Sequence, residues 1–218
     1  MKKEKRLYTR RGRALRAAAL ALALLLFCNG VLHIGFLLPS QAFRCAERRQ
    51  GVYEREKIVA RRWEPGMMHA TDRLFLAEGK NSLTLGCTYL TPYGWDPSFV
   101  WALDASEGGD VQAGVIAMGR GDKSALVFFG RIEGTDVEYL NANVRVDDVE
   151  NSHVYYYGHE IGNTERVVRN GCTYYICVAP EPVPEELSRL PRSYVLVVNR
   201  PDGSSDHAFE LTAGVSWG

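Results

Sequence analysis

The hydrophobic and polar positions divide the chain into one uninterrupted apolar run near its start and many short runs after it. No charged residue occurs in the 22 positions from Ala17 to Leu38. As an α-helix, this run would span about 33 Å, close to the hydrocarbon thickness of a bilayer. We therefore predict a membrane-spanning helix over residues 17–38, with the lipid bilayer as its partner.

Two uncharged polar residues interrupt this run. Asn29 and His33 are four positions apart, so they share one face of the helix. Side chains of this kind can hydrogen-bond to a neighbouring helix inside a membrane. A single membrane helix also tolerates two such residues without any partner, and both interpretations stay open.

After residue 70, short apolar or alternating runs recur, and Val, Ile, Tyr, Phe and Thr are concentrated in them. This composition and alternation are typical of β-strands with one buried face. We predict strands near 73–77, 82–90, 98–103, 111–118, 124–132, 136–146, 153–157, 172–179, 193–199 and 206–212. Only 183–190 has a helical pattern, with Pro184 in the first turn.

Turn residues separate these runs and set the expected fold. Residues 200–203 read Arg-Pro-Asp-Gly and predict a hairpin between the last two strands. Residues 120–123 predict another hairpin, and Asn170-Gly171 predicts a tight turn. Many short strands with one minor helix indicate a mainly β domain, an antiparallel β-sandwich or barrel, over residues 64–218.

Charge is distributed unevenly on the two sides of the apolar run. Residues 1–16 carry eight basic residues and one acidic residue, whereas residues 40–218 carry 18 basic and 25 acidic residues. By the positive-inside rule, we predict that 1–16 form a cytoplasmic tail and that the β-domain lies outside the cell membrane. The acidic balance of the larger part excludes nucleic acid as its expected partner, because phosphate binding needs a basic surface.

The segment 39–63 mixes charges of both signs, with seven basic and three acidic residues. We predict a solvated juxtamembrane stalk, with a helix lying near anionic lipid as the alternative. Glu64-Pro65-Gly66 then breaks the chain, so the β-domain is expected to begin at residue 64.

A cleaved signal peptide is the competing interpretation of the apolar run. Ser40 and Ala42 provide the small residues that a signal peptidase reads, with cleavage after Ala42. The run is longer than the roughly 7–15 residues of a typical signal-peptide core. We therefore favour an uncleaved anchor that crosses the membrane once, and the β-domain is exported in either case.

Four cysteines lie outside the apolar run, at positions 45, 87, 172 and 177. An exported domain can form disulfides. Cys172 and Cys177 would face opposite sides of one strand, so they do not suit each other as partners. We predict a bridge from Cys87 to either Cys172 or Cys177, with buried free thiols as the alternative.

Aromatic residues provide the candidate ligand-binding positions. Tyr155 and Tyr157 would share one face of a strand, and Tyr156 the other. An exposed tyrosine face can bind a sugar or a peptide, although a sandwich core has the same pattern. Trp95 lies in an aromatic-rich loop that either closes the core or forms a binding lip.

Signals for catalysis or metal binding are weak. His159-Glu160 resembles a fragment of a metal or acid-base site without a partner at supporting spacing, and Arg120-Gly121-Asp122 resembles the integrin-recognition tripeptide but also suits a hairpin tip. The sequence has no CxxC pair, nucleophile elbow, phosphate-binding loop or HExxH helix. We therefore predict no catalytic residue, no metal and no cofactor.

Three functional hypotheses follow, and the first is favoured. The chain is a membrane-anchored binding or assembly module of the bacterial cell envelope, whose partner is a protein or a cell-wall component. The second hypothesis is an exported hydrolase or carbohydrate-processing enzyme that uses acids from different strands, with Asp96, Asp104, Glu133 and Glu160 as candidates. The third is a single-pass sensor or regulator that acts through a partner at Asn29 and His33.

Overall fold

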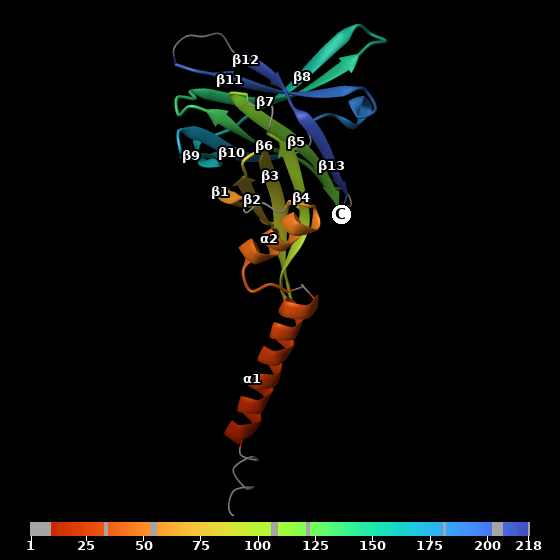
Figure 1. Ribbon diagram of the computed structural model, residues 1–218. Coiled ribbons are helices and arrows are strands. Elements are labelled where there is room, and N and C mark those ends of the chain that lie inside the picture. Colours follow the sequence, from red (N-terminus) through yellow and green to blue (C-terminus); the bar gives the residue numbers. More distant parts are fainter. Residues whose placement is uncertain are drawn as a thin grey trace, which may run out of the picture.

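The computed structural model describes residues 10–32, 35–52, 56–105, 109–120, 123–180, 182–201 and 207–217. Figure 1 shows a helix, α1, that extends away from a domain built almost wholly of β-strands. The prediction of a mainly β, antiparallel sandwich preceded by one apolar helix is confirmed.

The apolar helix is longer at its N-terminal end than the charge pattern predicts. α1 spans Arg10–Phe27 and continues as the π-helical segment η2, Cys28–Leu32, so the helix includes basic residues of the expected tail. None of these residues is buried, and the helix is long and apolar enough to cross a membrane. Asn29 lies in η2, whereas His33 lies outside the described residues.

The predicted stalk over 39–63 is wrong, because most of this segment is folded into the domain. Helix α2 covers Pro39–Arg49, and strand β1 covers Lys57–Trp63. Ala42, Phe43 and Ala46 lie on one face of α2 and are buried, while basic residues occupy the other face. The prediction relied on the number of charged residues in this segment. The spacing of its apolar residues is amphipathic and indicates a helix packed against the domain.

Within the described residues, the strands form three sheets, and the 3-10 turns are η3 (Asn163–Glu165) and η4 (Glu185–Leu187). The first sheet has the order β1 (Lys57–Trp63), β2 (Arg73–Glu78), β3 (Ser82–Thr91), β4 (Gly94–Asp104). The second sheet has the order β13 (Thr212–Trp217), β5 (Val111–Arg120), β6 (Lys123–Glu133), β10 (Cys172–Pro180), β9 (Arg166–Arg169). The third sheet has the order β12 (His207–Glu210), β11 (Arg192–Asn199), β7 (Tyr139–Asp148), β8 (His153–Glu160). All described neighbours are antiparallel except β13 and β5, which are parallel.

The three sheets stack as layers around two cores. One core joins residues of β1–β4 to residues of β5, β6 and β10, and the other joins β5, β6 and β10 to β7 and β11. Consecutive residues on β10 show the arrangement, because Tyr174 enters the first core and Tyr175 the second, and both are fully buried. α2 covers the outer face of the first sheet, where Phe43 stacks on Phe75 with ring centroids 5.3 Å apart.

Several local expectations can be compared with this architecture. Asn170 and Gly171 have positive φ values of 51° and 77° and form the predicted turn between β9 and β10. The predicted helix at 183–190 is only the short turn η4, and the predicted strand at 206–212 divides into β12 and β13. The expected hairpin tip at 120–123 includes Gly121 and Asp122, which lie outside the described residues.

Candidate functional site

A hollow lies between the C-terminal end of the apolar helix and α2. Its volume is about 700 Å³. It is lined by Asn29, Phe36, Ser40, Gln41, Arg44, Cys45, Arg48, Arg49, Ile58 and Arg61. We call this hollow the arginine pocket, because four guanidinium groups line it.

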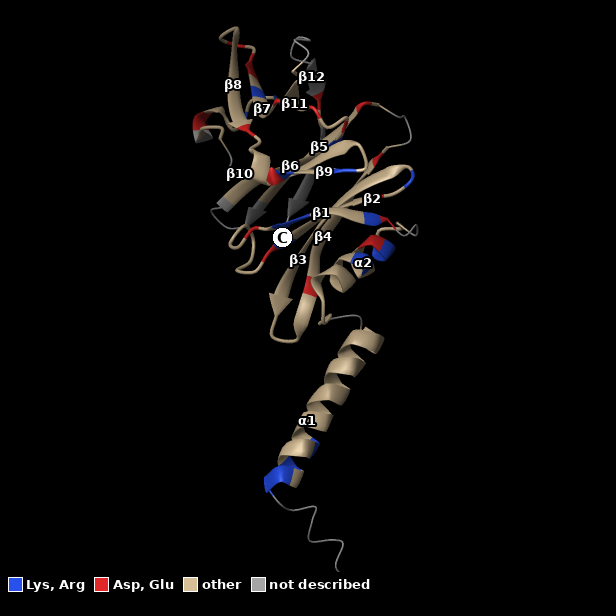
Figure 2. Cartoon of the chain, turned by 90° about the vertical axis from the view of Figure 1, so that its left-hand side faces the viewer, with Lys and Arg blue, Asp and Glu red and all other residues tan. Residues whose placement is uncertain are grey.

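The amphipathic pattern of α2 points its basic residues toward this pocket. Arg44 and Arg48 are four positions apart and lie on one side of α2, where the Arg44 guanidinium also lies 5.5 Å from the centroid of the Phe43 ring. Arg61 reaches the pocket from the exposed side of β1, where its Cζ atom lies 6.0 Å from the centroid of the Phe75 ring. In Figure 2, basic positions colour the start of α1 and part of α2.

Ionic contacts hold one wall of the arginine pocket in place. Arg44 donates to Glu47 at 2.6 Å and also to the carbonyl oxygen of Glu56. Burial raises the pKa of the Glu47 carboxyl to about 7, although the Arg44 guanidinium opposes this shift. Arg48 and Arg49 are exposed at the rim of the pocket. The pocket is therefore a positively charged hollow suited to an anion, since guanidinium groups bind phosphate and carboxylate oxygens in pairs.

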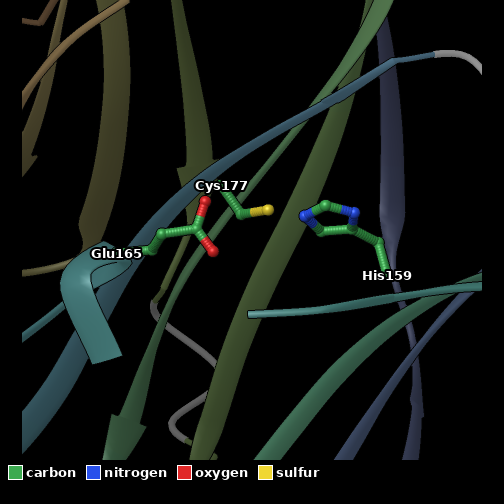
Figure 3. A group of neighbouring side chains, drawn as sticks. All are labelled: His159, Glu165 and Cys177. Atoms are coloured by element: carbon green, nitrogen blue, oxygen red, sulfur yellow. The ribbon is translucent and has the colours of Figure 1, made fainter. Parts of the chain in front are cut away.

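A second cluster joins three side chains that metals prefer. His159 at the end of β8, Glu165 in η3 and Cys177 on β10 place their ligand atoms within 4.8 Å of one another. Figure 3 shows the Cys177 sulfur between the His159 ring and the Glu165 carboxylate. Cys177 is buried, and the other two side chains are partly buried.

The carboxylate of this cluster is fixed by its neighbours. Gly162 donates its backbone N–H to Glu165 Oε2 at 2.9 Å, and Arg62 donates to Oε1. Arg62 is itself held by Glu64 at 2.8 Å and by the carbonyl oxygen of Ile176 at 2.9 Å. Glu165 therefore presents its carboxylate to Cys177 in one orientation.

The Cys177 thiol is unsuited to nucleophilic chemistry in this form. Burial raises its pKa far above the ordinary value, the Glu165 carboxylate raises it further, and Arg62 only partly opposes this. Nucleophilic cysteines are thiolates in partly exposed, electropositive surroundings. The three side chains are a candidate metal centre, because they bring a nitrogen, an oxygen and a sulfur ligand atom together.

The three aromatic binding candidates occupy packed positions. Tyr155 and Tyr157 face the core between the second and third sheets, while Tyr156 on the opposite face is 63% exposed, as the alternation predicts. Trp95 forms backbone hydrogen bonds with Phe36 at 2.8 and 2.7 Å. The Trp95 ring lies 5.3 Å from the Arg73 guanidinium. The ligand-binding role of these three residues stays a prediction, and their positions favour the alternative of packing.

The predicted disulfide from Cys87 is not formed, since all five cysteines are free thiols. The Cys87 sulfur lies 3.7 Å from Asp72 Oδ1 in the core between the first and second sheets. Cys172 enters that same core, and Cys177 enters the other one, so the expectation that they face opposite sides of a strand is confirmed. Cys87, Cys172 and Cys177 are buried free thiols, as the alternative interpretation predicted.

The four acids proposed for a hydrolase are spread over the three sheets. Asp96 and Asp104 lie near opposite ends of β4, Glu133 ends β6, and Glu160 ends β8. Asp96 also accepts a 2.7 Å hydrogen bond from the backbone N–H of Gly35, which gives it a structural contact. Their positions give the hydrolase hypothesis no support.

Sequence reasoning missed both clusters for different reasons. Arg44 and Arg48 have helical spacing, which could have revealed the arginine pocket. His159, Glu165 and Cys177 have no recognisable spacing, because only the stacking of β8 over β10 brings them together. Comparison of the sequence with models of known protein families finds no match, and a search of curated proteins finds none either.

Proposed function

We propose that this chain is a single-pass membrane protein whose β-domain serves as a binding or assembly module at the extracytoplasmic side of the bacterial cell membrane. In this proposal, residues 1–16 lie in the cytoplasm and α1 crosses the bilayer. The observation that carries the proposal is the arginine pocket at the junction between the apolar helix and the folded domain.

The dimensions of the helix support a pocket at the level of the lipid headgroups. The uncharged part of this helix, residues 17–32, corresponds to about 24 Å and follows the basic residues of the cytoplasmic tail. Asn29, which lines the pocket, lies one turn before the end of η2. Leu37 and Leu38 follow with 59% and 55% of their surfaces exposed, which suits the boundary between acyl chains and headgroups.

The position of Ala42 supports an uncleaved anchor. Ala42 is fully buried at the end of the first turn of α2, the helix that packs on the outer face of the first sheet. Cleavage after Ala42 would remove the first turn of α2 together with part of the arginine pocket. A membrane helix that stays attached keeps this pocket complete.

The chemistry of the arginine pocket favours anionic phospholipids. Guanidinium groups pair with phosphate oxygens, and basic clusters next to membrane helices attract anionic headgroups. Phe36 and Ile58 add an apolar wall suited to the glycerol and first acyl carbons. Lipid bound here would fix the orientation of the domain on the membrane.

This orientation leaves the third sheet available to the proposed protein or cell-wall partner. In Figure 1, β7, β8, β11 and β12 lie at the end of the domain farthest from α1. On β8, Val154 and Tyr156 are 47% and 63% exposed. Tyrosine is enriched where proteins bind each other, so this strand is the proposed contact.

The lipid part of the proposal can be tested by native mass spectrometry of the full-length protein. The protein in detergent would be mixed with phosphatidylglycerol or phosphatidylcholine, and retained lipid would be counted. We expect preferential retention of phosphatidylglycerol, and a roughly tenfold or greater loss in the double variant Arg48→Gln/Arg61→Gln, because each charge-assisted bond contributes about 1.5–3 kcal/mol.

The matched control is Arg169→Gln/Arg189→Gln, which removes two exposed arginines that do not line the pocket. This control should retain phosphatidylglycerol as the unmodified protein does. Equal retention of the two lipids, or an equal loss in both double variants, would contradict a headgroup site in the arginine pocket.

A further inference from the structure

The second cluster points to a metal site that the sequence pattern does not reveal. We propose that His159, Glu165 and Cys177 bind one Zn²⁺ ion, with water as the fourth ligand. This inference is independent of the arginine pocket, which lies at the junction with the apolar helix. It rests on the convergence of a nitrogen, an oxygen and a sulfur ligand from β8, η3 and β10.

The spacing of these atoms suits zinc. Ligands at about 2.0–2.3 Å from Zn²⁺ lie roughly 3.5 Å from each other in a tetrahedron. The three ligand atoms already lie within 4.8 Å of one another. Side-chain movements on the order of 1 Å would close the site.

The donor set separates zinc from the commoner cations. Calcium and magnesium prefer six or more oxygen ligands, whereas this cluster offers one carboxylate with an imidazole and a thiol. Imidazole and thiolate ligands suit zinc, and copper is the competitor with similar preferences. The site therefore has a soft set of ligands, with one nitrogen and one sulfur atom. The experiment must distinguish zinc from copper.

Neighbouring groups prepare the carboxylate for a metal. The Gly162 N–H and the Arg62 guanidinium orient Glu165, and Arg62 is in turn held by Glu64 and by the carbonyl of Ile176. In metalloproteins, hydrogen bonds from neighbouring groups fix the orientation of the side chains that bind the metal. The carboxylate keeps further lone pairs, so the contact with Arg62 does not exclude a metal.

The charges around the cluster also match a divalent cation. Glu64 and Glu165 carry two negative charges against the single positive charge of Arg62. Zn²⁺ and a Cys177 thiolate together add one positive charge. The metal, the thiolate, the two carboxylates and the Arg62 guanidinium then have no net charge. A cation would also separate the thiolate from the Glu165 carboxylate, whose repulsion otherwise opposes the charged form.

The proposed metal would fasten two layers of the domain. His159 belongs to the third sheet, Cys177 to the second, and Glu165 to the turn that precedes β9. Bound zinc would therefore hold β8 against β10 and stabilise the folded state by mass action. We expect the unfolding temperature of the full-length protein to rise when zinc is added after treatment with a chelator.

The test is metal analysis of the full-length protein in detergent, after chelator treatment and incubation with equimolar Zn²⁺ or Co²⁺. We expect about one tightly retained zinc per chain and, with Co²⁺, the charge-transfer absorption of a cobalt-thiolate bond. This spectrum needs no variant, so it tests the site even if a substitution prevents folding. No retained zinc, or cobalt bound without thiolate absorption, would overturn the proposal.

Matched variants assign the ligands. Cys177→Ser and His159→Gln should each weaken zinc binding by at least the roughly 10–100-fold seen when outer-shell partners are lost. Cys172→Ser and His153→Gln, on the same two strands, should leave it unchanged. Equal effects in the two pairs would overturn the assignment, as would copper without zinc in the full-length protein as purified from cells, since affinity alone favours copper at most nitrogen- and sulfur-containing sites.

Discussion

Glu47 shows how burial changes the chemistry of one residue. Its side chain is 3% exposed, lies against Arg44 and is close to Glu56. Burial raises the pKa of its carboxyl from 4.5 to about 7, since the charged form loses more hydration than Arg44 replaces. Between pH 4.5 and about 7, the Glu47 carboxyl is therefore protonated in the folded state and ionised in the unfolded state.

The sign of the pH effect follows from this difference. The contribution of Glu47 to stability is fully present below pH 4.5 and is lost as the pH rises through about 7. Glu47→Gln keeps a hydrogen-bonding group without the buried charge. We expect this variant to gain thermal stability relative to the unmodified protein at pH 8 and to gain none at pH 4.

This prediction is checked by thermal unfolding of the full-length protein and Glu47→Gln across that pH range. Gln50→Ala, an exposed change at the end of the same helix, is the control and should not alter the pH dependence. A constant difference in melting temperature between Glu47→Gln and the unmodified protein would contradict the assigned shift.

Residue-level prediction from the sequence succeeded where it depended on alternation along one strand. The opposite directions of Tyr156 and its two neighbours, and of Cys172 and Cys177, follow from the two-residue period. The strand β8 nevertheless continues through Gly158, where the sequence suggested an end. The meeting of His159 with Cys177 could not be predicted, because it depends on which sheets stack.

At the scale of elements, the docking of α2 depends on a single glycine. Gly86 on β3 lies under Phe43, and a Cβ atom at this position would lie 2.6 Å from two carbons of the Phe43 ring. Since Phe43 is fully buried on the outer face of the first sheet, it has little room to move. A glycine in a strand interior here marks the close approach of another element.

We expect Gly86→Ala to destabilise the domain by about 1–3 kcal/mol, the usual cost of overpacking a core. Equilibrium denaturation of the full-length protein would measure this loss. The control is Gly109→Ala, where the nearest atom lies 3.6 Å from the added Cβ. Equal stability of Gly86→Ala and the unmodified protein would show that α2 does not pack against β3 as described.

The elements that sequence reasoning missed have weak or concealed local patterns. The segment of α2 was predicted to be a solvated stalk, with a helix near anionic lipid as the alternative, because basic residues dominate its composition, although its apolar positions have helical spacing. The strand β1 is the next described element and pairs with β2 from Lys57 to Trp63. Short β9, with four residues, offers too little alternation to stand out.

At the scale of the whole molecule, the apolar helix and the β-rich class could be predicted, but the three-sheet stack could not. The choice of partners among strands depends on contacts between distant residues, which no local pattern records. One signal was available in β10, because residues 172–179 form a nearly continuous apolar run, which is typical of a strand covered on both faces, and the structure buries most of this strand. This strand forms the centre of the stack and carries Cys177 to the candidate metal centre.

The proposed arrangement gives each layer a separate role. The apolar helix holds the chain in the membrane, and α2 with the first sheet presents the arginine pocket to the lipid headgroups. The second sheet joins the two cores, and the third sheet lies farthest from α1, where a partner would bind. The proposed partner at the cell envelope requires the β-domain to lie on the outer side of the bilayer.

Site-directed labelling with a membrane-impermeant maleimide tests this requirement most directly. The variants would be expressed in a Cys45→Ser background and labelled in intact bacterial spheroplasts. Lys80→Cys, at an exposed turn of the β-domain, should react with the maleimide without permeabilisation. Thr9→Cys, in the basic tail, should react only after the membrane is permeabilised. Reaction of Thr9→Cys in intact spheroplasts while Lys80→Cys stays unlabelled would contradict the proposed topology, as would recovery of the full-length protein in the soluble fraction.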